Sequence, residues 1–310
     1  MARCCASCGR NFFKGSFSNN QWSKGVGISR CYACVQGTKG GGGIVTHQAA
    51  DQTARRNNAT QAEFTIAALT NPFAEGGFRW VAKGVYTAGG RSGQPCVCKW
   101  FKTGHVTEAS FFDLDVKAMD KAHDLVKEWN NRNMINQVVQ VNIPEVWMFS
   151  AGHLTGKRIL QEPFIQNYQK FNSNTGWADT DTPWPRVMQA LSHFSYHVSG
   201  GQFVLCDLQG GVYSDTVVLT DPVILSRSKQ YGVTDLGPLG ISSFFSNHVC
   251  NEFCHANWSR PADQRRYHLP QPGTSMAMAG GTNANQHVPT IVLRNKAILE
   301  KLKRLCISME

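Results

Sequence analysis

The stretch NHVCNEFC at residues 247–254 holds three side chains that commonly bind metal ions, His248, Cys250 and Cys254. A structural zinc site is closed by four ligands in a tetrahedron, so this stretch is one ligand short. Cys250 and Cys254 are four positions apart, which would place both on one face of a helix. We expect His193 to supply the fourth ligand, because its segment VMQALSHFSY should pack as an apolar helix against the core. A lone histidine there is more often a hydrogen-bonded core residue, and only the incomplete site favours the ligand interpretation.

A second set of cysteines lies at the N-terminus. Cys5 and Cys8 form one C-x-x-C pair, and Cys31 and Cys34 form another after 22 intervening residues. Two such pairs place four thiolates around one ion, and in a segment without a hydrophobic core the metal would supply much of the folding free energy. We therefore predict a second zinc site, with Cys4 as a competing ligand. The segment CASCGRNFFKGSFSNNQWSKGVGISRCYACV resembles the Stc1-type zinc module in its paired cysteines and its central FSNNQWSK, which implies a protein-interaction module.

Oxygen ligands cluster later in the chain. CDLQGG places Asp207 and Gln209 after an apolar strand, and LTDP brings Asp221 14 residues after Asp207. Two carboxylates and an amide at neighbouring strand ends suit Mg²⁺, a hard ion that shares its oxygen ligands with phosphates. Lys99 lies in the apolar strand CVCKW, where it either pairs with an anion or faces solvent, since burying an unpaired lysine is costly.

Two glycine-containing loops admit both a functional and a structural interpretation. PFAEGGFRW contains Gly76 and Gly77 before a strand, and TDLGPLG contains Gly237 and Gly240 before a helix pattern. Either loop could present backbone N–H groups to an anion, or simply make a tight turn. No H-R-D-x-x-x-x-N loop precedes the DLG triplet, and no G-x-x-x-x-G-K-[ST] motif occurs, so conventional kinase and P-loop signatures are absent.

Composition limits the class of protein that must position these groups. The 310 residues are 42% hydrophobic and 17% charged, and no apolar run approaches the roughly 20 residues of a membrane span. MARCCASCGR lacks the apolar core of a secretory signal, so we expect an intracellular protein, cytoplasmic or nuclear, with no membrane partner. The formal charge of +10 favours an acidic partner or a solvated basic surface without choosing between them.

The chain divides by composition into four parts. Residues 1–36 hold the paired cysteines, and residues 37–62, with four consecutive glycines, read as a flexible linker. Residues 63–256 form the main domain. Residues 257–310 form a polar tail, loosely ordered to about residue 286, which ends in an amphipathic stretch expected to be a packing helix.

The main domain combines strand and helix patterns. Its strands are expected at 78–88, 95–101, 138–143, 146–150, 158–165, 202–208 and 216–220, and its helices at 108–132 and 185–196. In the longer helix Leu114, Ala118, Ala122, Leu125 and Trp129 recur on one face. The domain begins with strands, continues with a helix that would pack on them, and mixes strands and helices in its second half. This order predicts a two-lobed α+β domain.

These pieces, in this order, resemble the alpha-kinase family of atypical protein kinases, which includes myosin heavy chain kinase and elongation factor kinase. The resemblance covers about residues 63–256 and rests on FAEGGFR, CVCKWF, LQEPFIQNYQKFNSNTGW, LSHFSY, CDLQGG, LTDP and DLGPLGISSFFSNHVCNEFC. It implies a two-lobed kinase-like fold with an integral structural zinc, whose two histidines and two cysteines fall on His193, His248, Cys250 and Cys254. A small zinc-ribbon-like module would precede this fold.

The resemblance also implies roles for single residues. Lys99 would contact ATP phosphates, Arg79 would support the phosphate loop with Gly76 and Gly77, and Asp207 would be the main catalytic acid. Glu162 and Ile165 would lie at the hinge that binds adenine, and Gln209 and Asp221 would bind Mg²⁺. The loop that contains Thr234, Gly237 and Gly240 would position the substrate. The segment GGVYSDTVV, longer than in some relatives, leaves the path between the two aspartates open.

The function expected from this resemblance is transfer of the γ-phosphoryl group of ATP to Ser or Thr of a protein substrate, with ATP, Mg²⁺ and two zinc ions as cofactors. The alternative is a catalytically silent, kinase-like zinc scaffold that binds nucleic acid or an acidic protein. Such a scaffold would bind nucleic acid with a strong dependence on salt and would not turn over ATP. The enzyme is favoured because every position needed for phosphoryl transfer is present. The N-terminal module offers a site for a protein partner.

Overall fold

The chain divides into two compact units in the computed structural model. The structure describes residues 2–6, 11–31, 35, 42–46, 57–77, 79–102, 112–152, 154–179 and 183–276. The first unit comprises the described residues up to 120 together with Val139–Tyr168 and Gly210–Thr220. The second comprises Lys121–Val138, Gln169–Gln209 and the described residues from 221 onward.

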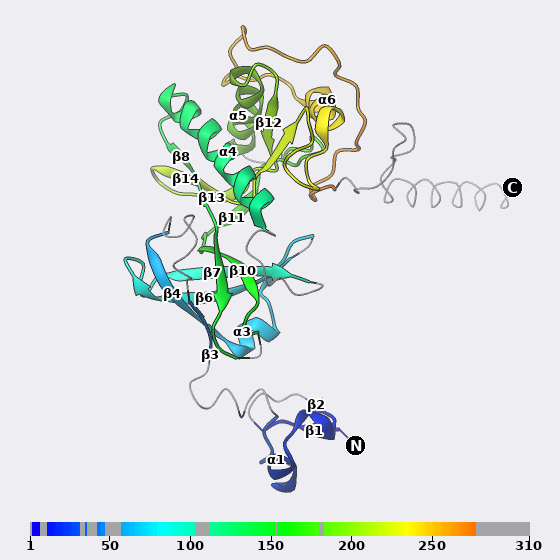
Figure 1. Ribbon diagram of the computed structural model, residues 1–310. Coiled ribbons are helices and arrows are strands. Elements are labelled where there is room, and N and C mark those ends of the chain that lie inside the picture. The colour runs from blue at the N-terminus through cyan, green and yellow to red at the C-terminus, as the bar shows by residue number, and fades with distance from the viewer. Residues whose placement is uncertain are drawn as a thin grey trace, which may run out of the picture. The chain divides into compact units, whose positions relative to one another are not determined.

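A seven-stranded antiparallel sheet dominates the first unit, in the order β4-β3-β9-β10-β7-β6-β5. Strand β4 also pairs with β6, so the strands from β4 to β6 close into a ring (Figure 1). Closure leaves these strands no open edge. The strands are β3 (Gly42–Thr46), β4 (Ala59–Thr65), β5 (Ala74–Glu75), β6 (Arg79–Gly89), β7 (Pro95–Phe101), β9 (Glu145–Phe149) and β10 (Arg158–Pro163).

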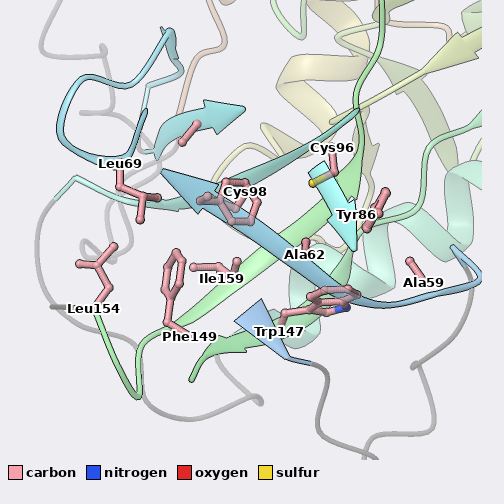
Figure 2. Close-up of a cluster of buried hydrophobic side chains, with 12 residues drawn as sticks. Ala59, Ala62, Leu69, Tyr86, Cys96, Cys98, Trp147, Phe149, Leu154 and Ile159 are labelled. Carbon is pink, nitrogen blue, oxygen red and sulfur yellow. The ribbon is translucent and has the colours of Figure 1, made fainter. Parts of the chain in front are cut away.

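Alternation along the strands separates two faces of this sheet. In β7, Cys96 and Cys98 point into a core that also holds Tyr86, Trp147 and Phe149 (Figure 2). Val97, between the two cysteines, and Lys99, after the second, therefore face the other side. In β10, Ile159 likewise lies in the core, whereas Leu160 packs with Phe112 and Val146 in a second cluster. The alternation thus brings Lys99 and Glu162, on neighbouring strands, to the face opposite the aromatic core.

A smaller sheet has the strand order β11-β13-β14-β8. Its strands are β8 (Val138–Val141), β11 (Tyr168–Lys170), β13 (Gln209–Val212) and β14 (Thr216–Leu219). Gly210, opposite Leu219, has φ +156°, and a Cβ there would lie 1.9 Å from the carbonyl oxygen of Val218. Only glycine fits this position, so GG in CDLQGG serves the close approach of β13 and β14.

The second unit is built on the antiparallel pair β12 (Phe203–Cys206) and β15 (Val223–Ser226). Helix α5 (Trp184–Val198) packs beside β12, and α6 (Gly237–Asn247) packs beside β15 (Figure 1). Nearly every residue of α5 from Pro185 to Tyr196 is buried, which agrees with its apolar sequence. Helix α4 (Asp113–Asn131) begins in the first unit and ends in the second.

Short elements complete the described chain. They are β1 (Arg3–Cys4), β2 (Asn11–Phe12), a 3₁₀ turn at Lys14–Ser16, α1 (Asn19–Ser23) and α3 (Ile66–Thr70). The Ser18 hydroxyl accepts a hydrogen bond of 3.1 Å from the backbone N–H of Gln21, and so caps the start of α1. None of the helices in the described ranges is long and apolar enough to cross a membrane.

Two segments differ from the sequence prediction. Residues 42–46 and 59–62, which were predicted to belong to the linker, lie in β3 and β4. The glycines of β3 can join the sheet because strand pairing uses only the backbone. In β4, Ala59 and Ala62 are buried in the core. The described part of the polar tail, residues 257–276, has no helix or strand. It is nevertheless held by hydrogen bonds, among them those from the backbone N–H groups of Tyr267 and His268 to the Ser243 hydroxyl, both 2.9 Å.

The core of the ring gives a first prediction. Phe149 is fully buried, and its ring meets that of Phe64 edge to face at 6.3 Å. Phe149→Ala should destabilise the protein by about 3–5 kcal/mol, because it removes buried contacts and leaves a cavity. Thermal unfolding followed by circular dichroism measures the change. Val85→Ala, at a position that is 45% exposed in β6, is the control. Equal melting temperatures for the two variants would contradict the assignment of this core.

Candidate active site and metal cluster

Four potential metal ligands come together in the second unit. Their donor atoms, on His193, His248, Cys250 and Cys254, all lie within 4.8 Å of one another. His193 Nδ1 is 3.2 Å from His248 Nε2 and 3.6 Å from Cys250 Sγ, and Cys254 Sγ is 3.7 Å from His248 Nε2. A zinc tetrahedron with bonds of about 2.0–2.3 Å has edges of about 3.3–3.8 Å. The cluster therefore has the size and the donor set of a closed tetrahedral site.

The ligands reach this cluster by a path that differs in part from the sequence prediction. His193 lies on α5, as expected. The expectation that Cys250 and Cys254 share a helix face is wrong, because α6 ends at Asn247 and His248 adopts an extended backbone (φ −72°, ψ 120°). The chain then turns, with the backbone N–H of Cys254 donating to the carbonyl of Asn251 at 2.9 Å. A turn brings the two thiols to the histidines as well as a helix would.

Neighbouring groups orient the ligands. His193 Nε2 lies 3.1 Å from the Ser259 carbonyl oxygen, so it carries the proton and leaves Nδ1 as the lone-pair donor. Arg260 donates from Nη1 to Cys250 Sγ at 3.5 Å and from Nη2 to the His248 carbonyl at 3.0 Å. Sequence analysis missed Arg260, which lies in the polar stretch that it assigned to the tail.

Burial sets the protonation of the cluster. It lowers the pKa of His193 to about 4 and that of His248 to about 3, so both imidazoles are neutral near pH 7, as metal ligation requires. Burial also raises the pKa of the Cys254 thiol to about 11. The thiolate thus needs a positive charge close to the sulfur, and a bound metal ion would supply it.

The N-terminal cysteines are described only in part. Cys5 and Cys31 are buried beside Phe17, and the backbone N–H of Cys31 donates to Cys5 Sγ at 3.3 Å. The spare Cys4 is exposed. Cys8 and Cys34 lie outside the described residues, so the second zinc site stays a prediction.

A polar cluster surrounds the carboxylate of Asp207, directly after β12. Lys170 Nζ forms an ion pair with Asp207 Oδ1 at 2.9 Å and lies 3.4 Å from Gln209 Oε1. Gln209 Nε2 makes long contacts of 3.5 Å with Asp207 Oδ2 and with the Asp221 carbonyl oxygen. The predicted residues Asp207, Gln209 and Asp221 therefore do come together. Lys170 was missed as a site residue, although it stands in the motif LQEPFIQNYQKFNSNTGW.

The backbone holds both aspartates in an unusual conformation. Asp207 has φ +57° and Asp221 has φ +47°, in the left-handed region that residues other than glycine seldom adopt. Asn172 fixes the turn after Asp207, since its Oδ1 accepts the backbone N–H of Leu208 at 2.8 Å and its Nδ2 donates to Ser192 on α5 at 3.0 Å. Such strain persists only where neighbouring groups impose it, and it is common at functional sites.

Burial and neighbouring groups act in opposite directions on the pKa of Asp207. Burial raises the pKa of its carboxyl group, and the nearby Asp221 adds to this, while Lys170 and the Thr274 hydroxyl act in the opposite direction. The ion pair with Lys170 nevertheless favours the charged form. A buried carboxylate with a raised pKa takes a proton more readily than one in water, which suits a general base.

A second buried ion pair lies in the first unit. Lys99 on β7 pairs with Glu162 on β10, and both side chains are almost fully buried. Thr220 links them, accepting from Lys99 Nζ at 3.3 Å and donating to Glu162 Oε2 at 2.9 Å, and Asn142 Nδ2 donates to the same carboxylate at 3.2 Å. Of the two interpretations of Lys99, the pairing with an anion is confirmed. Its partner is the carboxylate of Glu162, which sequence analysis had assigned to the hinge.

The residues predicted to form a phosphate loop lie in a hairpin turn. Gly76 and Gly77 are exposed between β5 and β6, and the backbone N–H of Gly76 donates to the Arg79 carbonyl at 2.9 Å. The Arg79 guanidinium forms an ion pair of 2.7 Å with Asp115 and lies over the ring of Phe101 at 4.7 Å. These contacts fix the base of the turn and leave the glycines open. Ile165, predicted for the hinge, is buried just after β10.

The TDLGPLG loop is organised by Asp235. Its buried carboxylate accepts hydrogen bonds from the backbone N–H groups of Ser226, Tyr231 and Gly237 and from the Ser226 hydroxyl, at 2.5–3.3 Å. Gly237 has φ +67°, which favours glycine, and Gly240 packs against Leu225 and Leu236. The Thr234 carbonyl accepts from Asn174 Nδ2 at 2.9 Å. The two glycines thus meet structural demands of the turn and of α6.

The metal cluster generates a prediction. Cys254→Ser should lower the zinc content of the full-length protein by about one equivalent per chain and should lower its melting temperature, because a hydroxyl is a poor zinc ligand. Elemental analysis and thermal unfolding measure both. Cys206→Ala, which removes a buried thiol of β12 outside the cluster, is the matched control. Unchanged metal content in Cys254→Ser would show that the cluster does not hold zinc.

Known proteins match this chain in sequence and in fold. The sequence is 32% identical over 213 residues to alpha-protein kinase 1 of Dictyostelium discoideum, which covers 65% of this chain and 15% of that protein. It is also 32% identical over 132 residues to eukaryotic elongation factor 2 kinase of Homo sapiens, covering 40% of this chain and 17% of that protein. The matches thus span a small part of these longer relatives.

Solved structures show the same fold. An alpha kinase from Entamoeba histolytica superposes with a TM-score of 0.57 at 19% identity and covers 76% of this chain and 97% of its own. The alpha-kinase domain of myosin heavy chain kinase A, in complex with AMP, gives a TM-score of 0.53 at 22% identity, with 69% and 96% of the two chains covered. The sequence profile of the alpha-kinase family matches residues 74–254, more than half of the chain. The chain therefore belongs to the alpha-kinase family.

Proposed function

We propose that this chain is an alpha-type protein kinase that transfers the γ-phosphoryl group of ATP to a Ser or Thr hydroxyl of a protein substrate. Family membership supports the class of reaction, and a solved relative is named as a complex of myosin-II heavy chain kinase A with ATP. The observation that carries the proposal is the buried carboxylate of Asp207, paired with Lys170 and close to Gln209. Such a group can take the proton of an attacking hydroxyl.

The proposed step places Asp207 as the base. The acceptor hydroxyl oxygen forms a bond to the γ-phosphorus, the bond from that phosphorus to the β,γ-bridging oxygen breaks, and ADP leaves with the bond electrons. The hydroxyl proton goes to the Asp207 carboxylate. Lys170 orients that carboxylate by pairing with Oδ1, so that Oδ2 faces the acceptor. Phosphoryl transfer of this kind depends mainly on positioning and on charge compensation.

The other site residues would hold the nucleotide and the metal ions. Lys99, fixed by Glu162, would contact the ATP phosphates, and Arg79 would support the loop of Gly76 and Gly77. The segment from Glu162 to Ile165 after β10 would receive the adenine. The loop with Thr234, Gly237 and Gly240 would position the protein substrate. These roles rest on the resemblance to the alpha-kinase family and on the contacts described above.

The donor sets fit the expected metals. Gln209 and Asp221 offer the hard oxygen ligands that Mg²⁺ prefers, and the ion would neutralise phosphate charge. The cluster of His193, His248, Cys250 and Cys254 fits a structural zinc ion in size and chemistry. We further propose that the N-terminal segment is an Stc1-like zinc module for a protein partner, supported by the packing of Cys5 and Cys31.

The base assignment is tested by substitution. At saturating ATP and Mg²⁺, Asp207→Asn should reduce phosphorylation of mixed protein substrates by about 10²-fold or more, because the substitution removes the proton acceptor. Labelled ATP followed by phosphoamino-acid analysis measures the product. Asp215→Asn, in the exposed turn between β13 and β14, is the control and should retain activity. Retained activity in Asp207→Asn would remove Asp207 from this role, and salt-dependent nucleic-acid binding without ATP turnover would favour a silent scaffold.

The pH dependence tests Lys170 as a positioning residue. Asp207 acts as a base only when it is charged, so kcat/KM should fall as the pH drops through its raised pKa. Lys170→Met removes a cation that lowers this pKa, and should move the acidic limb to higher pH, whereas Lys170→Arg should keep it near that of the wild type. Rate profiles between about pH 5 and 9 check this. An unshifted limb in Lys170→Met would contradict the role.

A further inference from the structure

Three consecutive residues of the tail lie against the metal cluster. The family profile matches residues 74–254, so Trp258, Ser259 and Arg260 follow the matched segment. The buried indole of Trp258 meets the His193 ring edge to face, with centroids 5.4 Å apart, and the Ser259 carbonyl oxygen lies 3.1 Å from His193 Nε2. These residues and the cluster belong to the same compact unit. The tail therefore adds an outer layer to the ligands that the family motif provides.

Arg260 makes the most extensive contacts of this layer. Its Nη1 donates to Cys250 Sγ at 3.5 Å, and its Nη2 donates to the carbonyl oxygens of His248 at 3.0 Å and of Phe245 at 3.3 Å. Its guanidinium carbon lies over the Phe245 ring, 5.5 Å from the centroid. The Phe245 carbonyl is among the last four of α6, which lack partners within the helix. One planar group thus joins the end of α6 to two ligand residues.

Cys250 is the ligand that most needs such a partner. It is exposed, whereas His193 and His248 are buried and Cys254 is intermediate. It also lies in residues 248–254, which form no helix or strand, so regular backbone hydrogen bonds do not fix its position. Groups that hydrogen-bond to metal ligands orient them, and loss of such a group typically lowers metal affinity about 10–100-fold. Arg260 supplies a donor of this kind to the most exposed sulfur.

We infer that Arg260 is a positioning residue of the metal cluster, which holds Cys250 against the ion and so sets how tightly the ion is retained. The inference rests on the proposal that the cluster binds zinc, and it does not depend on phosphoryl transfer. Without the guanidinium, Cys250 is free to turn towards solvent. Each such movement opens one position on the ion to water or to a competing chelator.

The first test compares the zinc affinities of full-length variants by competition with a chromogenic chelator of known affinity. Cys254→Ser, measured in parallel, identifies the zinc equivalent that belongs to the cluster and not to the N-terminal cysteines. Arg260→Met should lower the affinity of this equivalent about 10-fold or more. Arg266→Met is the matched control and should keep it, because Arg266 donates at the same end of α6, at 3.0 Å, to Asn247, which is not a ligand.

Cobalt substitution gives a second readout, which a merely structural role for Arg260 would not change. Co²⁺ in place of zinc absorbs light through charge transfer from the thiolates to the metal. A donated N–H withdraws electron density from sulfur, so Arg260→Met should move this absorption band to longer wavelength, whereas Arg266→Met should leave it in place. The Cys254→Ser spectrum again separates the cluster from the N-terminal cysteines.

The outcomes separate this inference from the other proposals. Wild-type affinity or an unmoved band in Arg260→Met would overturn the inference, and so would an equal loss of affinity in Arg266→Met. A wild-type cluster that retains no zinc would overturn both the inference and the proposed zinc site. Phosphorylation of added protein by that chain would still leave the proposed reaction intact.

Discussion

The carboxylate of Asp207 is almost fully buried in the second unit, where an ionised group needs a partner. An unpaired charge in that position would cost several kcal/mol, and burial alone drives the group towards its neutral form. The ion pair with Lys170 opposes this, and the Thr274 hydroxyl adds a charge-assisted hydrogen bond. The arrangement around Asp207 follows from this requirement, since each neighbour either compensates the charge or fixes the backbone that carries it.

The cluster of histidines and cysteines is connected to the Asp207 turn through the scaffold. His193 comes from α5 and the other three ligands follow α6, and these two helices pack beside β12 and β15. Asp207 follows directly after β12, and Asn172 ties the turn after it to Ser192, the residue before His193. A bound ion would thus hold together the helices that flank the strand pair. Such an ion would limit movement of the turn that carries Asp207.

Some of this could be predicted from the sequence, and the reasons differ from residue to residue. His193 was identified because three ligands in one short stretch demanded a fourth, and a closed tetrahedral site is a strong constraint. For Lys99 the apolar strand left two interpretations open, an anionic partner or exposure to solvent. Its partner Glu162 was not predicted, because pairing across two strands depends on their register. Lys170 carried no local signal, since a lysine in a polar motif is ordinarily a surface residue.

The tail shows where composition misleads. A stretch rich in Pro, Gly, Asn and Gln forms no regular element, and residues 257–276 indeed have none, but lack of regular structure does not imply lack of specific contacts. Those contacts are made to side chains such as Asn174, about a hundred residues earlier in the sequence, which no local pattern connects to Ser275. Such pairings become visible only once the fold has brought the two segments together.

Two buried aspartates of the second unit show how similar groups acquire different uses. Asp235 accepts four hydrogen bonds, three from backbone N–H groups and one from the Ser226 hydroxyl, so both oxygens are occupied by groups that define the turn before α6. Among the residues that the structure describes, the Asp207 carboxylate is contacted by side chains: a lysine on one oxygen and, on the other, the hydroxyl of Thr274 and a long contact from Gln209. A side chain that bonds to a carboxylate can move away and let a substrate group take its place. A backbone N–H group cannot move away from the carboxylate without disrupting the fold. Asp235 is therefore suited to a structural role, whereas the partners of Asp207 are the kind that the proposed base would have to exchange.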